Sequence, residues 1–164
     1  MATSTVNSVP VGLGELHVAQ EGELIAYSLG SCVAICLYDP VSRAAAMAHV
    51  VLPAAPASGP GATPGKFADT AVPALLEALL GVGASPTRLH CWLAGGAAVL
   101  PLGGGGSLPN IGQRNAEAAR AALARARIAV RGEALGGNRG RTVRLLAGVG
   151  RVLVRTVSGP EVEL

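Results

Sequence analysis

The sequence predicts an α+β protein, a layered sandwich of mixed β-sheet with two main helices. Two observations support this fold class. Short apolar runs rich in valine, isoleucine and leucine recur along the chain, and 23 glycines and 11 prolines separate them as turn signals. Two longer alanine-rich segments have helical spacing. With 164 residues, we expect one domain, residues 1–164, that is long enough to bury a core.

The expected elements follow in order along the chain. The strands are residues 13–19, 24–28, 32–38, 44–51, 88–94, 128–134, 141–147 and 151–157. The helices are residues 66–80, with a local kink at Pro73, and about 110–127, where Asn110 and Gln113 form a start similar to a capping box. A turn at Tyr38-Asp39-Pro40 joins two of the strands as a hairpin.

Two segments lack a periodic pattern. Residues 52–65 contain four prolines and three glycines, which predicts a mobile loop that either covers a site or links two elements. Gly103-Gly104-Gly105-Gly106-Ser107 is expected to be a flexible turn.

Charge is distributed unevenly. Residues 114–155 contain ten arginines and only two acidic residues, Glu117 and Glu133. No aromatic residue alternates with these arginines for base stacking, so an acidic protein surface is a better expected partner than nucleic acid. The chain shows neither an apolar stretch of membrane-spanning length nor a leader pattern, and we expect a cytoplasmic protein that does not insert into a membrane.

Cys32 and His49 are the candidate catalytic residues. Cys32 begins an apolar run after the small residues Gly30 and Ser31, and His49 lies on the next expected strand. In an antiparallel hairpin, residues near the two open ends approach each other across the ladder, so the imidazole is placed to take the thiol proton. The alternative interpretation is a buried cysteine and a histidine that lines the core.

The other cysteines and histidines are expected to have structural roles. Cys36 and Cys91 lie among apolar neighbours as small buried side chains, and His17 and His90 are structural or surface residues. No cluster has the spacing of a metal site, and the glycine-rich stretches lack the pattern of a phosphate loop. We therefore expect no metal and no cofactor.

Six blocks of sequence resemble the CheD family of chemoreceptor glutamine deamidases. They occur in the family's order over about residues 12 to 157. The blocks are Leu29-Gly30-Ser31-Cys32-Val33, Ala46-Met47-Ala48-His49-Val50-Val51-Leu52-Pro53, Lys66-Phe67-Ala68-Asp69-Thr70-Ala71, Gly95-Gly96-Ala97, Asn110-Ile111-Gly112-Gln113-Arg114-Asn115 and Gly136-Gly137-Asn138-Arg139-Gly140-Arg141. The resemblance implies a fold similar to toxin-type cysteine deamidases.

The resemblance also implies an activity and two partners. The activity is hydrolysis of glutamine side chains to glutamate on the cytoplasmic domains of methyl-accepting chemotaxis receptors, with Cys32 as nucleophile and His49 as base. CheC-type phosphatases are the second implied partner. Two alternatives remain open: a catalytically weak module that regulates such a phosphatase, and a thiol hydrolase with an unrelated substrate.

Two positions depart from the family pattern. One is Ala134, close before Gly136-Gly137, where the family often carries an acidic residue. The other concerns a third member of the site. The family usually has a threonine five or six residues before the cysteine, as a third member of the site, where this chain has Tyr27 and Ala26. Ser28 is the nearest small hydroxyl. Strand alternation places it on the face of residue 26, so Ser28 is the candidate third catalytic residue.

Overall fold

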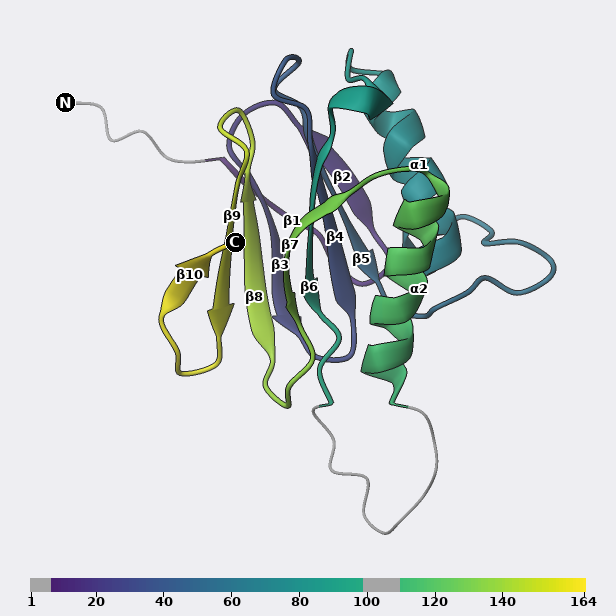
Figure 1. Ribbon diagram of the computed structural model, residues 1–164, viewed down its shortest axis with the longest axis vertical. Coiled ribbons are helices and arrows are strands. Elements are labelled where there is room, and N and C mark those ends of the chain that lie inside the picture. Colours follow the sequence, from purple (N-terminus) through teal and green to yellow (C-terminus); the bar gives the residue numbers. More distant parts are fainter. Residues whose placement is uncertain (1–6, 99–109) are drawn as a thin grey trace, which may run out of the picture.

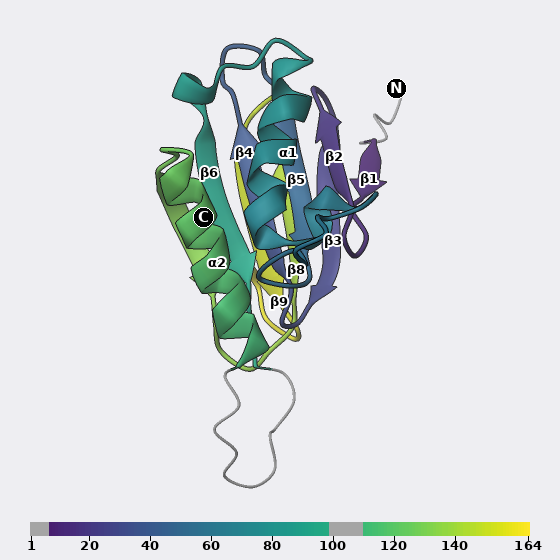
Figure 2. The ribbon, with the colours of Figure 1, turned by 90° about the vertical axis from the view of Figure 1, so that its right-hand side faces the viewer.

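The computed structural model describes residues 7–98 and 110–164. Two β-sheets and two helices form three layers, with the helices at one side of the view in Figure 1 and in front of the strands in Figure 2. The sheet beside the helices is named the central sheet, and the other is named the outer sheet. The expected turn Gly103–Ser107 lies outside the described residues.

The central sheet has five strands in the order β2-β5-β4-β6-β7. Its strands are β2 (Leu16–Ala19), β4 (Val33–Tyr38), β5 (Ala45–Val50), β6 (His90–Gly95) and β7 (Val130–Leu135). All pairs are antiparallel except β6 with β7. Every residue of β4 and β5 is buried, because these strands have a layer on each face.

The outer sheet has five strands in the order β1-β3-β8-β9-β10. Its strands are β1 (Ser8–Pro10), β3 (Glu23–Leu29), β8 (Arg141–Leu146), β9 (Arg151–Thr156) and β10 (Glu161–Glu163). Only β1 pairs in the parallel sense. Both sheets are therefore mixed, as the sequence predicts.

Two apolar cores join the layers. Val33, Ile35 and Leu37 of β4 pack toward helices α1 (Ala68–Leu80) and α2 (Ile111–Arg125). The alternate residues of β4, such as Ala34 and Cys36, pack against the outer sheet. Strand alternation therefore decides which side chains meet the helices and which lie between the sheets.

Most expected elements are confirmed, with shifts of a few residues at their ends. The helix expected over residues 66–80 begins two residues later, as α1, and continues through Pro73. Lys66 instead ends a 3₁₀ turn, Pro64–Lys66. A second 3₁₀ turn, Pro86–Arg88, precedes β6. The edge strands β1 and β10 were not expected, because three residues are too few to show alternation.

The start of α2 is confirmed only in part. The Asn110 side chain accepts a hydrogen bond from the Gly112 N–H at 2.9 Å, as an N-cap residue does. The Gln113 side chain donates to Glu117 at 3.1 Å instead of turning back to the cap, so the capping-box expectation is wrong.

The segment over residues 52–65 is tied down at both ends. The Leu52 N–H donates to the Lys66 carbonyl, and the Ala68 N–H donates to the Leu52 carbonyl. Between these ends the chain projects beyond the helices in Figure 1. No helix among the described residues is long and apolar enough to span a bilayer.

Candidate active site

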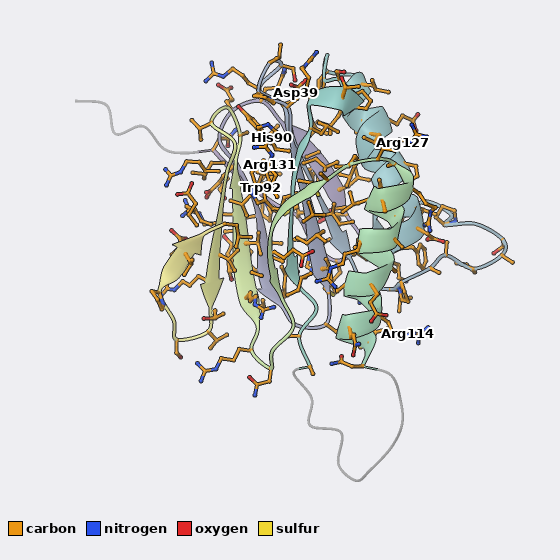
Figure 3. The ribbon with its side chains drawn as sticks, in the orientation of Figure 1. Asp39, His90, Trp92, Arg114, Arg127 and Arg131 are labelled. Atoms are coloured by element: carbon orange, nitrogen blue, oxygen red, sulfur yellow. The ribbon has the colours of Figure 1, made fainter. Side chains whose placement is uncertain are left out.

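The candidate nucleophile lies where β3 turns into β4. Cys32 immediately precedes β4, is half-buried, and packs against the core between the two sheets. In Figure 1 the turn from β3 to β4 lies at the lower end of the sheets, and we call this the site end. The Asp39 end is the opposite end, because Asp39 follows the last residue of β4 and lies at the top of Figure 3.

Strand register places His49 beside Cys32. His49 of β5 pairs with Ala34, and Val50 pairs with Val33, which confirms the expected hairpin. Cys32 lies two residues before Ala34 and therefore projects to the same face as Ala34 and His49. The two side chains occupy diagonal positions across the ladder, a spacing of about 7 to 8 Å between α-carbons in antiparallel pairs.

The His49 ring is fixed by a backbone carbonyl. Its Nδ1 lies 2.9 Å from the Val11 carbonyl oxygen. Because that oxygen can only accept, Nδ1 carries the hydrogen and Nε2 presents its lone pair. Nε2 is buried and has no hydrogen-bond partner among the described residues. This tautomer leaves one basic nitrogen free on the face that the ring shares with Cys32.

The electrostatics keep both groups neutral at rest. Burial lowers the pKa of His49 below its ordinary value of 6.5, opposed by the hydrogen bond to Val11 and the charge of Glu15. Burial also raises the pKa of the Cys32 thiol above 9.0. Both shifts favour the uncharged forms, a protonated thiol and a neutral imidazole.

The loop of Gly30, Ser31 and Cys32 is held at all three carbonyls. The Gly30 carbonyl accepts from the Ala97 N–H at 2.8 Å, and the Cys32 carbonyl accepts from the Gly96 N–H at 2.8 Å. The Ser31 carbonyl accepts from the Asn115 side chain at 2.9 Å. Three donors from two other elements thus fix the backbone that carries the thiol.

Gly95 allows this close approach. Its φ is 115°, and a Cβ there would collide with the Cys32 carbonyl oxygen. Arg141 adds a further contact, because its guanidinium donates to the Gly95 carbonyl at 2.6 Å and to the Gly136 carbonyl at 2.5 Å. Burial lowers the pKa of Arg141, and no carboxylate among residues 7–98 and 110–164 pairs with it.

Ser28 lies in a different environment from the other two candidates. The β3–β8 register shifts between Ala26 and Leu29, and Ser28 has a positive φ of 52°. Ala26 is fully buried between the sheets, whereas Ser28 is exposed and lines a hollow on the outer sheet with Tyr27 and Arg144. The strand alternation that placed Ser28 on the face of residue 26 is therefore wrong, because a bulge interrupts it.

The remaining cysteines and histidines lie away from this loop. Cys36 and Cys91 are free and fully buried, as expected. The Nε2 of His17 lies 3.6 Å from a carboxylate oxygen of Glu15, and the His90 ring packs edge-on against Tyr38 and Trp92. Figure 3 labels His90 and Trp92 near the Asp39 end. The sequence did not indicate the Val11 carbonyl, and it gave no role to Asn115, although Asn115 stands in one of the six blocks.

Comparison with known proteins supplies the family. A family model described as CheD chemotactic sensory transduction matches residues 51–156. A relative from Symbiobacterium thermophilum, named probable chemoreceptor glutamine deamidase CheD, is 52% identical over 157 residues, covering 94% of this chain and 95% of its own. The chain belongs to the CheD family.

Two further CheD relatives extend the comparison. The chemoreceptor glutamine deamidase CheD of Thermotoga maritima is 43% identical over 152 residues, covering 92% of this chain and 93% of its own. A probable chemoreceptor glutamine deamidase CheD of Haloarcula marismortui is 38% identical over 162 residues, covering 98% of this chain and 92% of its own. The CheD family model begins at residue 51, after Cys32 and His49, whereas these relatives match nearly the whole chain.

Proposed function

We propose that this chain is a chemoreceptor glutamine deamidase that works through Cys32 and His49. The names of its CheD relatives support the substrate class. The single observation that carries the mechanism is the His49 ring, whose Nδ1–H donates to Val11 and whose Nε2 is free on the face it shares with Cys32. The proposal takes residues 1–164 as one catalytic domain that acts in the cytoplasm on receptor cytoplasmic domains.

The first half of the reaction forms a thioester. Nε2 of His49 takes the Cys32 proton while the sulfur attacks the carbonyl carbon of the glutamine side chain. The carbonyl oxygen becomes an oxyanion, and backbone N–H groups of the Gly30–Cys32 loop stabilise it. The intermediate collapses when His49 returns the proton to the nitrogen, and ammonia leaves.

The second half releases glutamate. His49 takes a proton from a water molecule, and the resulting hydroxide attacks the thioester carbonyl. The second oxyanion collapses, and the sulfur leaves and regains its proton from His49. The carboxylic acid that forms releases its own proton to solvent, and a carboxylate remains on the receptor. The net reaction consumes one water molecule, converts one amide into a carboxylate, and requires no cofactor.

Intact-mass analysis of a receptor cytoplasmic fragment tests this proposal. Incubation with the wild-type protein should add about one mass unit for each glutamine converted, because –NH₂ is replaced by –OH. Cys32→Ala and His49→Ala should abolish the mass gain. Cys36→Ala is the matched control, because this cysteine is buried between the sheets, and its variant should retain the gain. A mass gain that survives Cys32→Ala would refute the assignment of the nucleophile.

Ser28 remains a candidate third group, and the same assay decides its role. Its exposure on the outer sheet and the Val11 contact of His49 both favour a backbone orienting group over this hydroxyl. We therefore expect Ser28→Ala to keep the turnover within about twofold of wild type. A loss of 100-fold or more would make Ser28 a member of the catalytic site after all.

A CheC-type phosphatase partner is a second proposal, favoured by Ala26. Ala26, which is buried, is one of the two positions, with Tyr27, at which the family usually has a threonine, so a weakened catalyst that regulates a phosphatase is the alternative function. Pull-down of a CheC-type phosphatase with wild type and Cys32→Ala distinguishes the two functions. Binding by both proteins with no receptor turnover by the wild type supports the regulatory role, and turnover without binding supports the enzyme alone.

A further inference from the structure

Asn115 is a buried polar residue that the proposed reaction does not use. It lies on α2, is 0% exposed, and its Nδ2 donates at 2.9 Å to the Ser31 carbonyl and at 3.0 Å to the Val51 carbonyl. These carbonyls belong to the chain segments that immediately precede β4 and follow β5. Asn115 therefore bridges the two segments beside Cys32 and His49.

The orientation of the amide follows from its partners. Both neighbours are carbonyl oxygens, which accept only, so the nitrogen and not the oxygen of the side chain faces them. The Oδ1 atom is left buried with no hydrogen-bond partner in the described part of the chain. A buried acceptor without a partner lowers the stability of the fold, so stability alone does not account for an asparagine at this position.

The contact with Ser31 determines where the next N–H points. The described chain contains no cis peptide bond, and in a planar trans peptide the N–H is antiparallel to the preceding carbonyl. Holding the Ser31 carbonyl toward α2 and Val51 therefore directs the Cys32 N–H away from them. Within residues 7–98 and 110–164, no hydrogen bond from that N–H is found, so it is available to a ligand.

We propose that Asn115 is a positioning residue that fixes the Ser31–Cys32 peptide so that the Cys32 N–H donates to the oxyanion. This inference rests on the proposed Cys32 chemistry, and it goes beyond it by assigning the oxyanion donor and the group that aims it. Asn115 does not touch the substrate. It acts through one peptide plane, and its bond to Val51 keeps the ends of β4 and β5 at a fixed spacing.

Two small reagents separate this role from general support of the fold. Acylation of Cys32 by p-nitrophenyl acetate passes through an oxyanion, whereas alkylation by iodoacetamide displaces iodide and forms none. In Asn115→Ala, we expect the Cys32-dependent acylation rate to fall about 10- to 100-fold while alkylation stays within about twofold. With a receptor fragment, kcat should fall and KM should not change.

Two variants serve as controls, Arg88→Ala at the Asp39 end and Cys32→Ala at the proposed nucleophile. Arg88→Ala removes side-chain hydrogen bonds at that end and should change neither rate. Cys32→Ala gives the background acylation to subtract. Equal losses of acylation and alkylation in Asn115→Ala, unchanged acylation, or wild-type acylation no faster than that of Cys32→Ala would each overturn the inference. Acylation without any receptor deamidation would refute the proposed function and leave the inference supported.

If Asn115→Ala does not fold, a measurement on the wild-type protein tests the proposed Cys32 N–H donor instead. Acetylation of Cys32 places a thioester oxygen in the proposed position, so the Cys32 amide proton should move downfield in a ¹H–¹⁵N spectrum. An unchanged Cys32 amide resonance would overturn the inference.

Discussion

The two ends of the central sheet differ in whether their buried polar atoms have hydrogen-bond partners. At the Asp39 end, the fully buried carboxylate of Asp39 accepts from the backbone of Val41 and Ser85, the Ser42 hydroxyl and two nitrogens of Arg88. At the site end, the buried atoms Nε2 of His49 and Oδ1 of Asn115 have no partner in the described residues. The buried carboxylate at the Asp39 end is therefore fully hydrogen-bonded, whereas the site end contains two buried polar atoms without a partner.

Because of this difference, we expect one end to contribute mainly to the stability of the fold and the other mainly to the proposed reaction. A fully satisfied buried network stabilises the fold and fixes a turn, whereas a buried polar atom without a partner lowers stability, and at the site end the unpartnered Nε2 of His49 is also the nitrogen that can accept a proton. The half-buried cation Arg141, which donates to loop carbonyls rather than to a carboxylate, follows the same pattern at the site end. We expect substitutions at the two ends to change different measurements.

The largest expected effect is on turnover, from Gly95→Ala. A Cβ at this position collides with the Cys32 carbonyl oxygen and displaces the nucleophile loop, so turnover should fall about 100-fold or more. Gly83→Ala is the matched control, since Gly83 also has a positive φ, 87°, but has open space around it. Receptor-fragment mass analysis gives both rates, and wild-type turnover in a folded Gly95→Ala protein would contradict the tight packing at Cys32.

The next effect is on stability, from Asp39→Ala. Five donated hydrogen bonds lose their acceptor, and we expect the melting temperature to fall by about 5–10 °C while turnover per folded molecule stays within about twofold. Asp69→Ala is the control with a smaller expected loss, because Asp69 accepts one bond, from the Ala55 N–H. A loss of turnover beyond the unfolded fraction would show that the two ends are coupled.

The same carboxylate makes stability depend on pH. Hydrogen bonds from Arg88, with those from Val41, Ser85 and Ser42, hold the pKa of Asp39 well below its usual range, against the effect of burial. A depressed carboxylate pKa contributes stability that is present above the unfolded value of about 3.9 and is lost as pH falls further. In Asp39→Ala, the melting temperature should therefore fall less steeply than in the wild type as the pH drops below about 3.9.

The smallest effect is on the pH profile, from Glu15→Gln. The acid limb of kcat/KM should report the pKa of His49, with a midpoint below 6.5 because burial lowers it. The charge of Glu15 raises that pKa, so its removal should move the midpoint down by about a few tenths of a pH unit. Glu21→Gln, an exposed change, should leave the midpoint in place, and an upward shift in Glu15→Gln would refute the assignment of the limb to His49.

The sequence predicted the hairpin that joins Cys32 to His49, because both strands are long apolar runs around an Asp-Pro turn. It did not predict the Val11 contact, since any residue supplies a backbone carbonyl and only the fold decides which one meets His49. The Ser28 prediction depended on alternation, which a one-residue bulge interrupts. Asn115 belongs to a block that resembles the family, but its two acceptors are distant in the sequence.

The raised pKa of the Cys32 thiol has a consequence for oxidative damage. Peroxides attack thiolates rather than thiols, so a cysteine whose pKa is raised is oxidised more slowly than one with an ordinary pKa. Burial also raises the pKa of Cys91, to about 12, and that of Cys36, so neither offers a reactive thiolate. The protein should therefore tolerate aeration and storage without reductant better than an enzyme whose cysteine rests as an ion pair with histidine.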